Sequence, residues 1–200
     1  MNAASADTGP DPQPFLRPAA RRSFPGRLSL VLYPDAVLRA VCEPVETFDG
    51  ALRDVADEML ALMCQHQGIG LAAPQVGLRQ RLFVCGIGER CFALANMRVG
   101  DSADPHDFVE GCLSLPGVQV SVRRPERIRI TGYDLWGRRR SFGATGLWAR
   151  VIQHELDHLN GVLICDHRPP DDGNCPVDQA GLPAVLVELR TRRSRPDRGR

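Results

Sequence analysis

The residues best suited to chemistry stand in the motif H-E-x-x-H at residues 154–158. On an α-helix, His154 and His158 lie one turn apart on the same face, so both imidazoles can reach one metal ion. Glu155 lies beside them, where it can take a proton from a water that the metal activates. The motif fixes only three residues in five and also occurs by chance, so alone it leaves open whether a metal binds here.

The residues before the motif predict the helix that carries it. Leu147, Val151, His154 and His158 follow helical spacing, and Thr145 is a plausible N-cap. Apolar side chains therefore precede the histidines along one stripe. This pattern predicts a helix whose inner face is buried at one end and chemically active at the other.

A catalytic zinc-like site takes three protein ligands and leaves one position for water. The metalloprotease continuation of the motif, with a third histidine, fails here because Ile164 stands in the final position and His167 comes three residues later. Glu188, a candidate in another known pattern, lies beyond a proline-rich break. Cys112 is the remaining good candidate, since it follows a glycine in a tight segment and metal binding would deprotonate its thiol.

The remaining elements are predicted from periodicity and from turn residues. Apolar spacing predicts a helix over residues 52–63, and short β segments are expected at 82–85, 91–95, 118–122, 128–133 and 138–142. Three aspartates and a proline predict a polar loop at 100–108. The glycine-rich segment 68–77 contains Gln75 and, taken alone, favours an ordinary loop with a solvated glutamine.

The composition sets limits on the class of protein. Two hundred residues, 43% of them hydrophobic, favour one domain with a solid core, and a net charge of +1 provides no field for DNA or for an anionic membrane. No apolar run approaches the ~20 residues of a membrane span. The first ten residues lack the features of a secretory signal, so we expect the cytoplasm.

We divide the chain into a disordered extension at 1–27, a domain at 28–168, and a tail at 169–200 with at most one short helix near 182–189. The seven cysteines show no paired spacing. We therefore expect six buried free thiols, and Cys112 as the exception.

Three segments together resemble the signature motifs of the peptide deformylase family, in the family's order. They are G-I-G-L-A-A-P-Q-V-G at 68–77, E-G-C-L-S at 110–114 and Q-H-E-L-D-H at 153–158. The resemblance covers roughly residues 28–167. It departs where the family commonly has Asn-Pro and this chain has Asn96-Met97, which could alter a loop but touches no chemical position. It implies an α+β fold in which antiparallel strands surround the helix with H-E-x-x-H.

The resemblance also implies an activity and a set of roles. The substrates would be nascent peptides that begin with N-formylmethionine, and hydrolysis would give formate and a free amino terminus. The implied metal is most often Fe(II), although zinc, nickel or cobalt can occupy such a site. The implied metal ligands are Cys112, His154 and His158, the implied general base is Glu155, and the implied donors to the formyl oxygen are the Leu113 N–H and the Gln75 amide.

Other residues would bind the peptide. We expect the peptide to add as a strand beside Gly68, Ile69 and Gly70, and the methionine side chain to enter an apolar pocket formed by Leu147 and Val151. Glu110 is expected to orient the cysteine segment, and Asp157 to form a local salt bridge or a buried hydrogen bond. A monomer is expected, with the ribosome as a candidate partner.

Two alternatives stay open from the sequence. A metalloendopeptidase shares the H-E-x-x-H chemistry, but Ile164 and the cysteine segment disfavour it. A non-catalytic metal-binding paralogue, acting through its tails, belongs to a different class of protein. The intact Glu155 and Gln75 argue against that alternative, because an inactive copy needs neither residue.

Overall fold

A five-stranded antiparallel sheet and two α-helices form the part of the chain that the computed structural model describes, residues 28–167. The sheet order, β1-β2-β3-β4-β5, follows the chain, and the predicted α+β class is confirmed. The predicted extension at 1–27 and the tail with its short helix lie outside the described residues. The elements are η1 (Ala36–Arg39), α1 (Gly50–Gln65), β1 (Gly70–Ala72), η2 (Ala73–Val76), β2 (Leu82–Ile87), β3 (Arg90–Cys112), β4 (Leu115–Tyr133), β5 (Arg139–Thr145), α2 (Gly146–Leu159) and η3 (Ile164–His167), where η marks a 3-10 helix.

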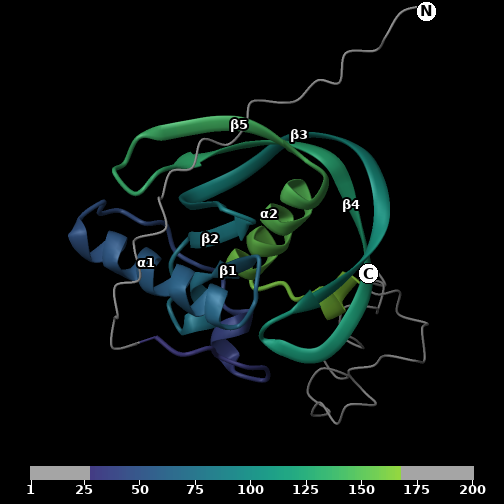
Figure 1. Cartoon of the computed structure of the whole chain (residues 1–200), viewed down its shortest axis with the longest axis horizontal. Helices are drawn as coiled ribbons and strands as arrows, with labels where there is room; N and C mark the ends of the chain where they lie inside the picture. The colour runs from purple at the N-terminus through teal and green to yellow at the C-terminus, as the bar shows by residue number, and fades with distance from the viewer. Residues whose placement is uncertain (1–27, 168–200) are drawn as a thin grey trace, which may run out of the picture.

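The helix α2 lies at the centre of the molecule, and the long strands β3 and β4 curve around it, while α1 lies to one side near β1 and β2 (Figure 1). The side chains of β2 pack toward both helices, one face of the strand toward each. Successive side chains of a strand point to opposite faces, so Phe83 and Cys85 pack in the core cluster that contains α2, and Leu82 and Val84 pack in the cluster that contains α1. The unbroken apolar run of β2 therefore reflects burial on both faces.

Both predicted helices are present. Helix α1 begins at Gly50, two residues before the predicted start, and the side chain of Asp49 caps it by accepting a hydrogen bond of 3.0 Å from the Leu52 amide. Thr145 occupies the N-cap position of α2, but its side chain makes no capping hydrogen bond. Neither described helix is long and apolar enough to cross a membrane.

The predicted polar loop at 100–108 is wrong. These residues belong to β3, which pairs with β4 over almost its whole length, and residues 118–133 likewise form one strand instead of two. The three aspartates face solvent, and two of them pair with arginines of β4: Asp107 lies opposite Arg123 in an ion pair of 3.2 Å, and Asp104 pairs with Arg127. In this part of β3, charged pairs with β4 thus replace the alternation of apolar and polar residues by which a strand is usually recognised in a sequence.

The cysteine prediction is correct only in part. Cys42, Cys85 and Cys165 are buried and belong to no disulfide, but Cys64 is exposed on α1 and Cys91 is half-buried. The seventh cysteine lies outside the described residues.

Candidate metal centre

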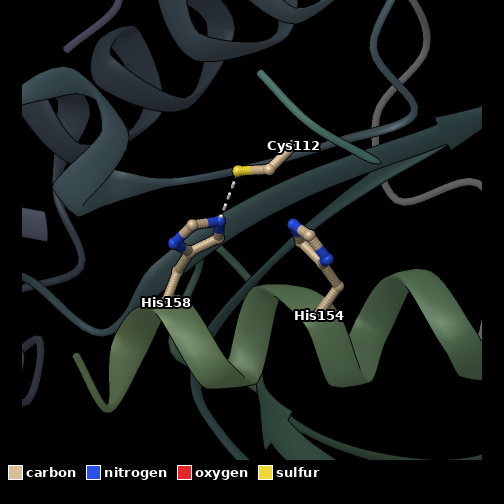
Figure 2. Close-up of side chains that lie close together, drawn as sticks. All are labelled: Cys112, His154 and His158. Atoms are coloured by element: carbon tan, nitrogen blue, oxygen red, sulfur yellow. Dashed lines mark hydrogen bonds between the residues drawn. The ribbon is translucent and has the colours of Figure 1, made fainter. Parts of the chain in front are cut away.

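Three ligating side chains from two elements meet above α2. His154 and His158 extend from successive turns of α2, and Cys112, the last residue of β3, faces them from the sheet (Figure 2). The Cys112 sulfur lies 3.2 Å from Nε2 of His158, and one ligand atom from each of the three residues lies within 4.8 Å of the other two. The structure therefore brings together the three ligands that the sequence predicted.

The donor set fits a divalent cation. Ligand atoms around a tetrahedral ion with zinc-like bond lengths are separated by about 3.5 Å, which is close to the spacing found here. His158 is 1% exposed, and its burial lowers its pKa well below the ordinary value, which favours the neutral imidazole that a metal requires. One thiolate and two imidazoles suit iron, zinc, nickel or cobalt and do not favour the hard ions magnesium and calcium.

Glu110 fixes the orientation of one histidine. Its buried carboxylate lies 3.1 Å from Nδ1 of His154 and also accepts hydrogen bonds of 2.8–3.0 Å from Arg124 and Arg150. Burial raises the pKa of Glu110, but the hydrogen bonds from His154, Arg124 and Arg150 outweigh it and hold the pKa at about 2. An ionised Glu110 makes Nδ1 of His154 the N–H donor, which leaves Nε2 for the metal. The carboxylate thus reaches a histidine, whereas the sequence analysis expected it to orient the cysteine segment.

Two buried arginines were missed by the sequence analysis. Arg124 and Arg150 are 4% and 6% exposed, and both bind Glu110. Arg124 also forms a 2.8 Å ion pair with Asp157, which confirms the local salt bridge predicted for that aspartate. His167, too late in the sequence to be a ligand, lies 2.7 Å from the same carboxylate.

A signal for both arginines was present in the sequence. Val118, Val120 and Val122 alternate as buried residues of β4, and Arg124 continues that period onto the inner face. Arg150 lies four residues before His154 and therefore on the same face of α2. A charged residue on an inward-facing position predicts a buried charged partner, and Glu110 is that partner.

Glu155 lies buried next to His154, in the wall of the same pocket. Its side chain is almost fully buried, and Oε2 has no hydrogen-bond partner among residues 28–167. Burial raises the pKa of Glu155 to about 7, which suits an acid–base group that works near neutral pH. A Cβ atom at Gly70 would lie 2.2 Å from Oε1 of this carboxylate, so the close approach of β1 to α2 requires glycine at that position.

Gln75 is buried, so the solvated glutamine that the glycine-rich loop favoured is wrong. Its side chain, 1% exposed, extends from η2 toward the thiol, and Nε2 lies 3.7 Å from the Cys112 sulfur. Leu113 and Ser114 form the two-residue turn that joins β3 to β4, so the Leu113 amide immediately follows the thiol. The sequence analysis did not single out Ser114, although it lies inside the cysteine motif.

A pocket of about 450 Å³ opens over these groups. Its walls include all of the predicted site residues except His158, which lies deeper. The walls also contain the apolar side chains of Phe108, Leu147 and Val151. Leu147 is 45% exposed and lies at the rim, so the apolar stripe of α2 reaches the opening of the pocket and is not buried along its whole length.

Comparisons with known proteins agree on one family. The sequence model of polypeptide deformylase matches residues 28–173. A peptide deformylase of Hydrogenovibrio crunogenus is 46% identical over 144 residues, which make up 70% of this chain and 85% of that protein. The crystal structure of a peptide deformylase from Synechococcus elongatus in complex with actinonin has a TM-score of 0.76 and 39% identity, covering 80% of this chain and 89% of that one.

A second solved structure contains a bound peptide. The Met-Ala-Ser-bound peptide deformylase from Acinetobacter baumannii has a TM-score of 0.68 and 28% identity, covering 70% of this chain and 98% of that one. The residues that the family model matches, 28–173, contain the whole described site, and the identities are high enough for more than a likeness of fold. The chain therefore belongs to the polypeptide deformylase family.

Proposed function

We propose that Cys112, His154 and His158 hold one divalent cation, beside which Glu155 acts on formylated peptides. As a member of its family, the chain is a hydrolase that removes the formyl group from the N-terminal formylmethionine of newly synthesised proteins, giving formate and a free amino terminus. The family is metal-dependent. One observation carries the assignment of roles: the three ligand atoms lie within 4.8 Å of one another, beside a buried carboxylate oxygen that has no partner among the described residues.

A cation bound by these three residues would supply Lewis acidity, which polarises the formyl carbonyl and makes water more acidic. We propose Fe(II) as the natural ion, with zinc, nickel or cobalt able to replace it, because one thiolate and two imidazoles accept all four. Glu110 supports this ligand set, because its carboxylate contacts Nδ1 of His154 and so leaves Nε2 of the same ring facing the thiol.

Glu155 carries the proton in the proposed reaction. As a buried carboxylate whose pKa is about 7, it accepts a proton from the attacking water and then donates that proton to the departing amine. The low exposure of the carboxylate keeps bulk water from competing for this proton. Gly70 contributes indirectly, because the absence of a side chain leaves room for Oε1.

The formyl oxygen gains negative charge as its carbon becomes tetrahedral, and two donors are placed to stabilise that charge. The Leu113 backbone N–H follows the thiol in the β3–β4 turn, and the Gln75 amide faces the thiol from η2. Removal of one such donor typically costs about 3 kcal/mol of transition-state stabilisation. Both donors belong to the pocket wall.

The peptide backbone is proposed to add to the free edge of β1. Strand β1 is the first in the sheet and pairs with β2 on one side only, where Gly86 donates its amide hydrogen to the Ile69 carbonyl. Gly68 and Ile69, which directly precede β1, and Gly70, its first residue, line the pocket. Main-chain pairing of this kind gives affinity without reading sequence, which suits an enzyme that processes many different proteins. The methionine side chain would enter between Leu147 and Val151.

The function is tested by formate release from formyl-Met-Ala-Ser with anaerobically prepared, metal-loaded protein. The Met-Ala-Ser bound to the Acinetobacter enzyme is the expected second product here. Formate in stoichiometric amount with Met-Ala-Ser supports the proposal. Cleavage of an unformylated internal peptide bond would instead identify an endopeptidase, and metal binding without turnover of either substrate would identify the non-catalytic alternative.

We propose the cytoplasm as the working compartment, because free cysteines, one of them a proposed metal ligand, require reducing conditions. A monomeric state and contact with the ribosome stay predictions. Size-exclusion chromatography with light scattering tests the first, and cosedimentation of the full chain with ribosomes tests the second.

A further inference from the structure

The carboxamide of Gln75 makes polar contacts through both its oxygen and its nitrogen. Oε1 accepts a bond of 2.8 Å from the Ala72 amide. Nε2 lies 3.2 Å from the hydroxyl oxygen of Ser114 and 3.7 Å from the Cys112 sulfur. Since the carboxamide is planar and its two N–H bonds diverge within that plane, fixing the oxygen and one N–H also fixes where the second N–H points.

The contact with Ala72 decides which end of the carboxamide faces the thiol. A backbone amide can only donate, so the atom facing Ala72 must be the carbonyl oxygen. A single anchor still leaves the side chain free to rotate about that contact. The hydroxyl of Ser114 is the second anchor, and it accepts the N–H that does not point at the sulfur.

Ser114 is itself held firmly. It is 0% exposed and forms the second residue of the tight β3–β4 turn. Its carbonyl accepts a hydrogen bond of 2.9 Å from the Tyr33 amide, and the Gln75 carbonyl accepts one of 2.8 Å from the Val31 amide. The same short segment thus ties the turn and η2 together, so the distance between the hydroxyl and the carboxamide is set by backbone contacts.

We propose that Ser114 is a positioning residue, whose hydroxyl holds the Gln75 carboxamide in the plane that directs its second N–H at the Cys112 sulfur and the adjoining pocket. This inference rests on the proposed function, because it assigns a cause to the placement of one donor. An N–H donated to a coordinated thiolate stabilises the sulfur lone pairs and tunes the metal centre. Loss of the hydroxyl frees the carboxamide to rotate, which weakens the contact with sulfur and the contact with the formyl oxygen together.

The first test uses Co(II) in place of the natural ion and requires no turnover. The absorption band that arises from charge transfer from sulfur to Co(II) should move to longer wavelength in Ser114→Ala, because the sulfur lone pairs lose a donor. Gln75→Leu should move the band in the same direction. Ser121→Ala provides the matched control, since Ser121 is an exposed serine on β4, and its band should match that of the unaltered protein.

The second test uses kinetics on formyl-Met-Ala-Ser. Ser114→Ala should lower kcat by about 10- to 100-fold, below the full loss of an oxyanion donor, and leave KM within about twofold. If Ser114 acts through Gln75, adding Ser114→Ala to Gln75→Leu should lower kcat no further. A merely structural role would give the same fold-loss in both backgrounds.

The proposal is overturned by an unshifted Co(II) band in Ser114→Ala, or by full additivity with Gln75→Leu. These outcomes differ from failure of the proposed function, in which the unaltered protein releases no formate but still binds Co(II). In that case the band positions alone decide the role of Ser114. The variant removes one buried oxygen and adds no bulk, and its thermal unfolding is measured alongside that of Ser121→Ala.

Discussion

Nδ1 of His154 lies 3.1 Å from Oε2 of Glu110, and the same carboxylate binds two buried arginines. Glu110→Gln replaces one oxygen with an NH2 group that repels these donors. Because His154 then loses its fixed orientation, we expect metal affinity to fall about 10- to 100-fold. Competition between the protein and a chelator for Co(II) measures this loss directly.

Asp107→Asn provides the control for Glu110→Gln. Asp107 lies three residues earlier on β3 and pairs with Arg123 in solvent, with 59% of its side chain exposed. Its loss should leave metal affinity unchanged. Equal metal affinities for Glu110→Gln and the unaltered protein would remove Glu110 from the support of the metal centre.

Glu155→Gln separates metal binding from the movement of protons. The amide has nearly the same shape as the carboxylate but cannot accept a proton, so kcat should fall by about 10²- to 10⁴-fold. Metal content, measured by elemental analysis, should stay at the level of the unaltered protein, because the three ligand atoms belong to other residues. Retained turnover would exclude Glu155 as the base.

The success of the sequence analysis follows from the kind of signal that each element carries. Helix α2 was predictable because its two histidines and its buried Val151 share one helical period, and α1 because its apolar residues follow helical spacing. The proposed metal ligands come from two segments that are far apart in the chain, so helical geometry could pair His154 with His158 but could not place Cys112 beside them. The three motifs taken together supplied that placement.

The failures have a common physical cause. The strand residues at 100–108 are stabilised by pairing with β4, and that pairing depends on a partner about 20 residues later in the chain. The solvated glutamine was wrong for a similar reason. Gln75 is buried because Ala72, Ser114 and Cys112 satisfy its polar groups, and two of these contacts join distant segments. Local composition records neither kind of contact.

Gly70→Ala tests the close approach between β1 and α2. The added Cβ would lie 2.2 Å from Oε1 of Glu155 and 2.8 Å from Cγ1 of Val151, so either the base or the strand must move. We expect kcat/KM to fall by at least 10²-fold, because a displacement of about 1 Å is enough to misplace a catalytic group. Steady-state kinetics on formyl-Met-Ala-Ser measure the effect.

Gly100→Ala is the matched control for Gly70→Ala. Gly100 is also a strand glycine, but the nearest atom to an added Cβ, the Arg129 carbonyl oxygen, lies 3.9 Å away. This change should leave kcat/KM unaltered. An equal loss in both variants would show that the site does not depend on the missing side chain at Gly70.

We expect Asp134, which is distant in sequence from the proposed metal ligands, to make the free energy of unfolding depend on pH. Its buried carboxylate closes the turn between β4 and β5, accepting the amide hydrogens of Trp136 and Arg138 and pairing with Arg140. Burial raises the pKa of Asp134, but these hydrogen bonds outweigh it and hold the pKa below its ordinary value.

A lowered pKa in the folded state means that the unfolded chain binds the proton more tightly. The stabilisation from Asp134 is therefore complete above the ordinary aspartate pKa of about 3.9 and is lost as the pH falls from there through the lower pKa of the folded state. Asp134→Asn should lower the free energy of unfolding by about 1.5–3 kcal/mol at pH 7, because charge-assisted hydrogen bonds are lost. Urea denaturation at a series of pH values should show this difference shrinking below pH ~4. Asp104→Asn is the control, because Asp104 forms an exposed pair with Arg127, and this variant should give no such trend. If the difference in the free energy of unfolding between Asp134→Asn and the unaltered protein stays constant down to the acid transition, the charge of Asp134 does not stabilise the turn.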